Sequence, residues 1–576
     1  MSRFGSRVQN SRSYNGFVVE SDVVTSSERK VEPDSNPRSS NYLRWFIGTA
    51  LAVGICLRLI GLHNPPYDNH HFRQCQTLST LEDFYRNGVD LLHPHAIYVG
   101  YPGLYVLELP LFQAIGAALY HWFGPHLELI RVLNIVIGAL TTLIFYRISL
   151  LWFNRTTAIL GAIIYWLAPL NIVFQRSTLL DPMAVLCAMA SFYSMALLLA
   201  ARVPENSGQF SPTPGENRLW LWFSVFALTT LLTGLIKTLY LWPGVVLFAQ
   251  EFFARRCRLD RSLLPVAAVF AVTGLCFVLW NRYAAAANAA NVLSEGVKPT
   301  SLLGFSPLLK PEFYSFMLKT RPKVWLGLLG ALFYVFGLWA WWSERRTEGW
   351  KSRLFLIVCV PPTYLLAFAK INYPHDYYQL IITPFLAILS AKGVLWLARK
   401  FQSPALDYPV IAQRIFAAAI GVWIVAAVAN YVLWLKWPQV DHRAIAFEKL
   451  CAGKIEPWAP AILFGTHEAT GMNDYLPPFL YAGKLWGFGW VVPDAEAAKE
   501  KFEVVRAGFE RLDYVIFYGT QFPEWMPSNK FQLIHQDDVH RFFVFHSKKI
   551  SGSAFEPASR MSAQLSPEVR IGIAGE

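Results

Sequence analysis

The stretch RVLNIVIGALTTLIFYRISLL (131–151) is mostly apolar, and after a short polar break a second apolar run follows at 156–175. As an α-helix, each run is long enough to cross roughly 30 Å of hydrocarbon while it satisfies its own backbone hydrogen bonds. Blocks of about 18 to 24 such residues recur through most of the chain. The sequence therefore predicts a polytopic α-helical membrane protein.

The composition agrees with this class. Of 576 residues, 54% are hydrophobic and 15% are aromatic, and the mean hydropathy of +0.32 is high for a soluble protein of this length. The net charge of +12 does not indicate a nucleic-acid partner, because most Lys and Arg residues lie in short loops, where they orient helices. The seven cysteines include no close pair, so neither a disulfide framework nor a zinc site is expected.

The polar segment 1–42 is expected to be a disordered cytoplasmic tail, and the membrane domain follows at 43–437. About 11 to 13 transmembrane helices are predicted. The clearest spans lie at 43–62, 131–151, 156–175, 182–201, 219–236, 239–255, 262–281, 324–343, 353–370, 377–397 and 413–435.

The ambiguous segment is 101–122, which begins YPGLYVLELPLF and is interrupted by prolines and a glutamate. If it does not cross the membrane and the amino terminus is cytoplasmic, the dense basic loops all face the cytoplasm, as the positive-inside rule favours. These loops contain Arg155, Arg202, Arg218, Arg255, Arg256, Arg258, Arg261, Arg345, Arg346, Lys351, Arg353, Arg399 and Lys400. The segment then lies partly embedded in the first outer loop, although whether it fully spans stays open.

After Trp437 the apolar blocks end, and a soluble α/β domain is predicted at 438–550, on the outer side. Its expected strands are 461–466, 484–492, 514–520, 531–536 and 541–547, with an amphipathic helix at 494–512. The remaining segment, 551–576, is expected to be disordered.

Four predicted outer turns carry ionisable residues. The first, NPPYDNHHFRQCQT (64–77), contains Asp68, His70, His71 and Arg73. A solvated polar turn is the alternative to a functional site there. The second, FQRSTLLDPM (174–183), brings ionisable side chains to helix ends at membrane depth, where they are costly without a partner or a function.

The alternative for this second turn is a structural ion pair between Arg176 and Asp181. A third turn, AKINYPHDYYQL (369–380), offers His375 and Tyr378, although tyrosines at this depth often form an interfacial belt. The fourth is TGLIKTLYLWPG (233–244), where Lys237 could also be explained by snorkelling.

Separated carboxylates flanked by Arg, Lys and His suit a site that binds an anionic head group and removes a proton from an acceptor. Arginine and lysine can hold phosphate oxygens, and a carboxylate can act as a base or bind a divalent metal. The cations alone would equally suit a protein that binds lipids.

Several short motifs together resemble the family-39-type membrane glycosyltransferases of the GT-C fold. The motifs are the aspartate of DNHHFRQ after the first span, a run from Gly103 to Pro110 that contains Glu108, R-x-x-N at Arg131 to Asn134, R-x-x-x-x-D at Arg176 to Asp181, and H-x-Y-Y at His375 to Tyr378. The family includes protein O-mannosyltransferases and the transferases that add aminoarabinose to lipid A. The resemblance covers about residues 43–400.

The resemblance implies a polyprenyl-phosphate sugar donor, a glycan, lipid or protein acceptor, an outward-facing site and a single displacement that inverts the anomeric carbon. Asp68 matches the first-loop aspartate, the general base or its partner, and Asp181 matches the second acidic position. The implied donor-phosphate residues are Arg73, Arg176, Lys237, His375 and Tyr378, with His70, His71, Glu108 and Arg131 in support.

The chain departs from the family pattern at two places. Asn69 follows Asp68 where an acidic residue is usual, and YVGYPGLY replaces the usual K-P-P-L run, so no lysine is assigned there. Metal use stays open, with a divalent cation possible. The expected location is a bacterial inner or plasma membrane, and the alternative function is a lipid flippase or transporter without glycosyl transfer, for which charges near the bilayer midplane would be expected.

The orientation is testable by cysteine accessibility in intact cells. Cysteines introduced at 255–261 and 345–353 should react only after the membrane is permeabilised, whereas cysteines at 450–550 should react from outside, because the basic loops orient the helices. Labelling of both basic clusters from outside would contradict the predicted orientation.

Overall fold

The computed structural model describes residues 37–68, 70–100, 103–200, 216–289, 304–348, 353–400, 421–422, 425, 441–467, 477–506, 509, 511–520, 522–537 and 541–548. By their internal contacts, residues 1–48 and 49–576 form two separate units. The fold described below is that of the second unit. The predicted tails at 1–42 and 551–576 and the predicted span at 413–435 lie almost wholly outside the described residues.

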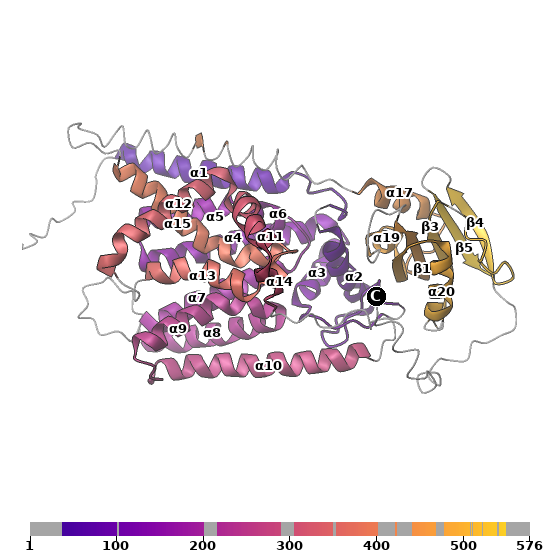
Figure 1. Cartoon of the computed structure of the whole chain (residues 1–576), viewed down its shortest axis with the longest axis horizontal. Coiled ribbons are helices and arrows are strands. Elements are labelled where there is room, and N and C mark those ends of the chain that lie inside the picture. The colour runs from indigo at the N-terminus through magenta and orange to yellow at the C-terminus, as the bar shows by residue number, and fades with distance from the viewer. Residues whose placement is uncertain are drawn as a thin grey trace, which may run out of the picture. The chain divides into compact units, whose positions relative to one another are not determined.

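Most of the described chain is helical (Figure 1). The α-helices before the carboxy-terminal domain are α1 (Pro37–Leu59), α2 (His71–Asn87), α3 (Leu111–Phe123), α4 (Leu127–Trp152), α5 (Arg155–Trp166), α6 (Pro169–Phe174), α7 (Asp181–Ala200), α8 (Glu216–Lys237), α9 (Trp242–Ala254), α10 (Leu263–Ala289), α11 (Pro311–Ser315), α12 (Arg321–Glu348), α13 (Arg353–Ala367), α14 (Ala369–Asn372) and α15 (Thr383–Lys400). Short 3₁₀-helices lie at η2 (Thr238–Leu241), η4 (Ser306–Leu309) and η6 (Tyr377–Ile382), and a π-helical turn lies at η5 (Phe316–Thr320).

Six helical stretches among the described residues are long and apolar enough to cross a membrane. They are Leu127–Trp152, Asp181–Ala200, Arg218–Ala254, Leu263–Ala289, Pro311–Ser343 and Tyr377–Lys400. The predicted spans at 219–236 and 239–255 fall within one of these stretches, as α8, η2 and α9. The chain is therefore an integral multi-pass membrane protein, as the sequence predicts.

The prediction of one continuous helix over 156–175 is wrong. α5 ends at Trp166, Ala168 has extended backbone angles (φ −62°, ψ 128°), and α6 begins at Pro169. Proline lacks a backbone N–H and disfavours the helical conformation of the residue before it, so the helix divides there. The predicted span at 353–370 is also shorter, because α13 has 15 residues.

Within the described residues 103–122, no helix is long enough to cross a membrane. Residues 103–110 are not helical, and α3 begins at Leu111. With 13 residues, α3 rises about 20 Å, which is less than the hydrocarbon thickness. The described part of this segment therefore agrees with the predicted non-crossing segment between α1 and α4.

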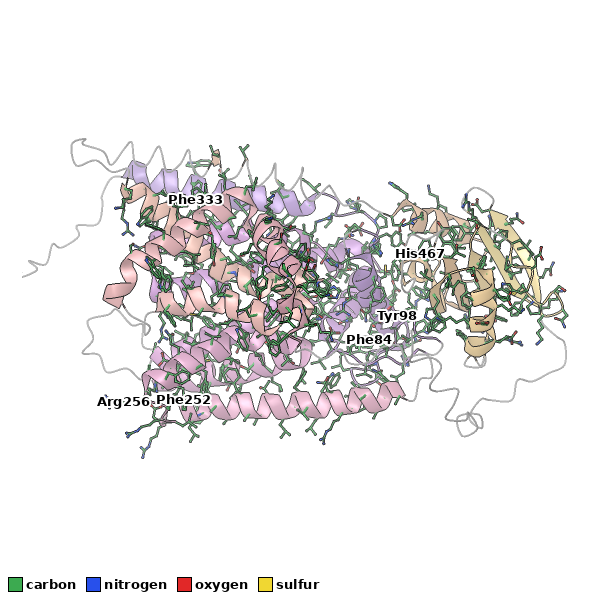
Figure 2. The ribbon with its side chains drawn as sticks, viewed as in Figure 1. Phe84, Tyr98, Phe252, Arg256, Phe333 and His467 are labelled. Carbon is green, nitrogen blue, oxygen red and sulfur yellow. The ribbon has the colours of Figure 1, made fainter. Side chains whose placement is uncertain are left out.

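Small residues let α12 and α15 approach closely. A Cβ atom added to Gly337 would collide with the carbonyl of Leu389, and one added to Gly393 would collide with the carbonyl of Phe333, which Figure 2 labels on α12. Close backbone approach at small residues is a main source of helix association in membranes.

The carboxy-terminal domain contains a five-stranded sheet with the order β2-β1-β3-β5-β4. The strands are β1 (Ala459–Thr466), β2 (Leu485–Val492), β3 (Tyr514–Tyr518), β4 (Phe531–Asp537) and β5 (Phe542–Ser547). β1 pairs in parallel with β2 and β3, whereas β5 pairs antiparallel with β3 and β4. All five predicted strands are confirmed.

The two faces of this sheet pack against different parts of the chain, because alternate residues of a strand point to opposite faces. Ile462 and Val515 pack with α20 (Ala495–Arg506), which confirms most of the predicted helix at 494–512. Leu463 and Ile516 belong to another buried cluster, which includes α17 (His442–Cys451) and α19 (Pro477–Ala482). This second cluster also contains residues of the segment between α1 and α4 (60–126), called the first loop below.

Tyr98 is one of these first-loop residues and is labelled in Figure 2. Two parts of this loop pair with each other, because His95 and Leu104 form an antiparallel bridge. Gly103 has a φ of +74°, and a Cβ atom there would lie 2.6 Å from the carbonyl oxygen of Ala96 and 2.9 Å from Nε1 of Trp486. Glycine is therefore required where the loop meets β2.

Candidate active site

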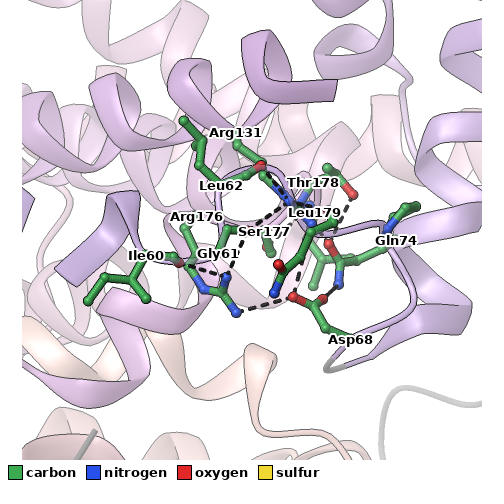
Figure 3. A network of polar contacts seen from close by, with 12 residues as sticks. Ile60, Gly61, Leu62, Asp68, Gln74, Arg131, Arg176, Ser177, Thr178 and Leu179 are labelled. Carbon is green, nitrogen blue, oxygen red and sulfur yellow. Dashed lines mark hydrogen bonds and ion pairs between the residues drawn. The ribbon is translucent and has the colours of Figure 1, made fainter. Parts of the chain in front are cut away.

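Asp68 ends a turn that leads into α2, and its carboxylate is buried, with 5% of the side chain exposed. Oδ2 lies 3.1 Å from Nη2 of Arg176 and 4.0 Å from Nη2 of Arg131. Oδ1 accepts a hydrogen bond from the side-chain amide of Gln74. Figure 3 shows this arrangement, which we call the Asp68 cluster.

The motif R-x-x-N on α4 holds together the two loops that meet in the Asp68 cluster. Nη1 of Arg131 donates to the carbonyl oxygens of Gly61 (3.1 Å) and Leu62 (2.7 Å), at the start of the first loop. Asn134, one turn along the same helix face, donates to the carbonyls of Ser177 and Leu179 in the loop that carries Arg176.

The guanidinium groups of this cluster retain hydrogen-bonding capacity. Among the described residues, Nε and Nη2 of Arg131 and Nε of Arg176 have no hydrogen-bond acceptor, although all three atoms are buried. Buried donors in native proteins are nearly always bonded, so donors without an acceptor indicate a place for a bound group.

Arg176 and Asp181 do not pair with each other, so the structural ion pair considered as an alternative is not formed. Arg176 pairs with Asp68 instead, and Asp181 lies with its Oδ1 3.1 Å from the hydroxyl of Tyr240 and 4.0 Å from Nζ of Lys237. The charges of this turn are therefore compensated by different helices.

Glu108 joins two of the predicted phosphate-binding cations. Its Oε1 lies 2.6 Å from Nζ of Lys237 and 2.9 Å from Nη2 of Arg73. Burial alone would raise the pKa of Glu108, but these two cations outweigh it and lower the pKa to about 2. Glu108 is therefore ionised at neutral pH and fixes the spacing of the two cations.

His70 joins α2 to the predicted H-x-Y-Y turn. Its Nε2 lies 2.6 Å from Oδ1 of Asp376, whose Oδ2 lies 3.3 Å from Nη1 of Arg321. His70 adopts a left-handed backbone conformation (φ 54°, ψ 39°), which is uncommon for a residue other than glycine and is held here by tertiary contacts. Its ring packs edge-on against Tyr377.

His375 and Tyr378 lie beside the Glu108 cations. The ring of Tyr378 is 4.8 Å from Nζ of Lys237, within cation–π range. Burial, with help from the positive charges of His70 and Arg73, lowers the pKa of His375 to about 4. At neutral pH, His375 is therefore uncharged.

The structure gathers the predicted site residues into three groups of contacts. Asp68 lies with Arg131 and Arg176, Glu108 lies with Arg73 and Lys237, and His70 pairs with Asp376 and packs on Tyr377. Lys237 also lies beside Asp181 and Tyr378, and His375 stacks on Tyr377.

His71 is the exception, since no described hydrogen bond or ion pair joins it to the others, and burial lowers its pKa. The sequence did not predict three of the partners: Gln74 for Asp68, Tyr240 for Asp181 and Arg321 for Asp376. Gln74 lies six residues after Asp68 in the quoted turn, but nothing in the sequence distinguishes it there.

No group of three or more His, Cys, Asp or Glu side chains is placed to hold a metal ion within the described ranges. The two carboxylate oxygens of Asp68 accept hydrogen bonds from Gln74 and Arg176. Oε1 of Glu108 forms ion pairs with both Arg73 and Lys237.

Residues 108–289 match the model of the dolichyl-phosphate-mannose-protein mannosyltransferase family. The matched segment contains Glu108, Arg131, Arg176, Asp181 and Lys237. No curated protein matches the sequence.

Solved structures resemble almost the whole chain. The crystal structure of ArnT from Cupriavidus metallidurans bound to undecaprenyl phosphate has 13% identity and a TM-score of 0.59, over 90% of this chain and 100% of that one. ArnT in the apo state gives 14% identity and a TM-score of 0.58 over the same shares. The apo oligosaccharyltransferase of Archaeoglobus fulgidus gives 11% identity and a TM-score of 0.54, over 83% of this chain and 70% of that one.

The resemblance to the family-39-type GT-C glycosyltransferases is confirmed. Identities this low establish the fold alone, whereas the match of 108–289 supports the enzyme class of glycosyltransferases. The fold likeness covers 90% of the chain, a larger share than the residues 43–400 of the sequence resemblance.

The lowered pKa of His375 predicts an acid-dependent loss of stability. Between about pH 6.5 and pH 4 the unfolded chain protonates this ring while the folded protein does not, so unfolding becomes more favourable as the pH falls. Between about pH 7 and pH 5, wild type should lose about 2 kcal/mol more unfolding free energy than His375→Asn.

Unfolding of the purified protein in detergent, followed at both pH values, measures this difference. The exposed His63→Asn variant, which removes a histidine paired with Glu128, serves as the control and should follow wild type. Equal losses in wild type and His375→Asn would show that His375 titrates normally.

Proposed function

We propose that this chain transfers a sugar from a polyprenyl-phosphate donor to a glycan, lipid or protein acceptor at the non-cytoplasmic face of the membrane. One observation carries the proposal: buried guanidinium N–H groups of Arg131 and Arg176 surround the Asp68 carboxylate without acceptors among the described residues. Such donors suit the oxygens of a phosphate group.

The charge balance of the site residues supports an anionic ligand. Four carboxylates face five permanent cations, which leaves an excess of positive charge before any contribution from histidine. The carboxylates are Asp68, Glu108, Asp181 and Asp376, and the cations are Arg73, Arg131, Arg176, Lys237 and Arg321. A phosphate linked to a sugar would be attracted to this excess.

Arg73, Arg176 and Lys237 are proposed to hold the donor phosphate, with Arg131 in support. Negative charge grows on the phosphate as its bond to the sugar breaks, so cations fixed in advance stabilise the transition state more than the ground state. Glu108 fixes two of these cations and thereby limits the reorganisation that they need.

His375 and Tyr378 are proposed to assist at the same phosphate. Because the pKa of His375 is about 4, its ring can donate a hydrogen bond at neutral pH but adds no charge. Their place beside Lys237 supports this assignment.

Asp68 is proposed as the general base. An acceptor hydroxyl attacks the anomeric carbon, the bond between that carbon and the phosphate oxygen breaks with its electron pair, and the hydroxyl proton passes to the carboxylate. Arg176 occupies Oδ2 of Asp68 in the structure. A donor phosphate competes for Arg176, which would free this oxygen for the acceptor.

Asp181 is proposed as the second catalytic carboxylate. It is buried at the start of α7, where the helix dipole stabilises negative charge, and the hydroxyl of Tyr240 lies beside it. Its neighbour Lys237 joins it to the phosphate-binding residues.

The ligand named in the ArnT structure, undecaprenyl phosphate, is a polyprenyl phosphate, the group that leaves when a donor of the proposed class gives up its sugar. The proposed location is a bacterial inner or plasma membrane, where such carriers present sugars to acceptors on the outer side.

Asp68→Asn tests the assignment of the base. The amide keeps the shape of the side chain but accepts no proton at neutral pH, so turnover should fall by at least about 10²-fold. Turnover is measured with the purified enzyme, a radiolabelled polyprenyl-phosphate sugar and membrane extract as the source of acceptor.

The matched control is Asp83→Asn, which removes another buried carboxylate on α2 that pairs with His95 and Asn87 outside the Asp68 cluster. It should retain turnover within about threefold of wild type. Near-wild-type turnover in Asp68→Asn would remove Asp68 from the proton transfer and favour Asp181. Absence of any sugar transfer by wild type, together with movement of lipid across the membrane, would favour a flippase.

A further inference from the structure

The first loop is joined to the carboxy-terminal sheet by backbone hydrogen bonds. The N–H of Gly487 in β2 donates to the carbonyl of Ile97, and the N–H of Gly100 donates to the carbonyl of Gly487, both at 2.7 Å. Val99 forms an antiparallel bridge with Phe488. β2 is an edge strand of the sheet, so the loop covers part of an edge that would otherwise expose unpaired backbone groups.

The loop and the domain also share one hydrophobic core. Tyr67, Cys75 and Tyr98 from the first loop lie in the same buried cluster as Phe447 and Trp486 from the domain. Cys75 is on α2, the helix whose first turns carry His70 and Arg73. Movement of the domain relative to α2 would therefore disrupt a packed core.

Two side-chain hydrogen bonds lead from this core to a proposed donor-binding cation. The amide of Gln76 donates to the hydroxyl of Tyr98 at 2.7 Å, and its carbonyl oxygen accepts from Nη1 of Arg73 at 2.5 Å. The other end of the guanidinium, Nη2, donates to Glu108 at 2.9 Å. Arg73 is therefore fixed at both ends, at one end by a residue of the shared core.

A second connection ends beside the proposed base. The hydroxyl of Tyr67 donates to Oε2 of Glu448 in α17 at 3.2 Å, and the carbonyl of Tyr67 accepts from the N–H of Asp441 at 2.9 Å. Tyr67 directly precedes Asp68 in the sequence. The domain therefore holds the backbone of the residue that leads into the Asp68 cluster.

We propose that the carboxy-terminal domain sets the geometry of the sugar-transfer site, and that Tyr98 is a positioning residue that acts on Arg73 through Gln76. This inference rests on the proposed function, because it assigns a role to the donor-binding cation. A bidentate arginine loses much of its advantage when its plane is free to rotate, since the fork must then be ordered again by the ligand.

The substitution Tyr98→Phe tests this role, because it keeps the ring that fills the shared core and removes the hydroxyl that accepts from Gln76. The hydrogen bond between Tyr98 and Tyr105 is lost with it, so the route through Gln76 is tested separately below. The dissociation constant of the full-length protein for polyprenyl phosphate should rise about 3- to 10-fold, as expected for the loss of one hydrogen bond that orders a charged group. Binding is measured by isothermal titration in detergent micelles. The Michaelis constant for the sugar donor should rise by a similar factor, with a smaller change in kcat.

Tyr514→Phe is the matched control. Tyr514 belongs to the same buried cluster and its hydroxyl accepts from the N–H of Glu456 at 3.3 Å, but no described contact joins it to Arg73. Its removal should leave the dissociation constant within about twofold of wild type. A purely structural effect would instead lower the stability of both variants and change donor binding in neither.

A double-mutant cycle tests the route through Gln76. Gln76→Ala alone should weaken binding as Tyr98→Phe does, and Tyr98→Phe should add less than about twofold in the Gln76→Ala background. Because Gln76→Ala breaks the same chain from the loop side, it also provides the test if Tyr98→Phe does not fold.

The results separate the inference from the proposed function. Wild-type protein that binds polyprenyl phosphate, together with Tyr98→Phe and Gln76→Ala variants that bind it equally well, would overturn the positioning role and leave the proposed function standing. Additive effects of the two substitutions would overturn the route through Gln76. Wild-type protein that neither binds polyprenyl phosphate nor transfers sugar would overturn both.

Discussion

The site depends on the burial of charged side chains that compensate one another. An ionised group inside a membrane protein is costly unless a partner of opposite charge or a bound ligand is present. Asp68 and Arg176 meet this requirement at 3.1 Å with 5% of each side chain exposed, although they lie on segments 108 positions apart. Their pairing joins the start of α2 to the loop between α6 and α7.

The remaining contacts extend this constraint through the site. Glu108 joins Arg73 to Lys237, and Asp376 joins His70 to Arg321. Each carboxylate thus pairs with side chains that come from different elements. An anionic donor that enters such a site meets positive groups already fixed in space, and this arrangement is the one that stabilises charge on a leaving phosphate.

Helices and strands that are marked by a continuous run of residue types could be predicted from the sequence. Long apolar runs identified most membrane helices, and β-branched and aromatic runs identified all five strands. The division of the helix at Pro169 was missed because the residues on both sides of this proline are apolar. The mean hydropathy of the run therefore stays high, although the helix is interrupted. The pairing of residues 97–100 with β2 was missed because the β-favouring run Ile97–Val99 has only three residues and lies between Pro94 and Pro102, too short to indicate a strand.

The residue types of the site were predicted better than their partners. Arg176 and Asp181 were considered as a pair because they are close in sequence, but tertiary contacts connect them to Asp68 and Tyr240. Gln74, Tyr240 and Arg321 carry no motif, and their roles follow only from where the helices place them. Hydrogen-bond partners are set by packing at long sequence separation, which a single sequence does not encode in any local pattern.

The most direct test of the account is a structure of the full-length protein with bound polyprenyl phosphate. The account predicts phosphate oxygens within about 3.2 Å of guanidinium or ammonium nitrogens of Arg73, Arg176 or Lys237, with the Asp68 carboxylate facing the vacant acceptor side. A phosphate bound instead beside Arg255 and Arg353, at the opposite ends of the helices, would contradict it.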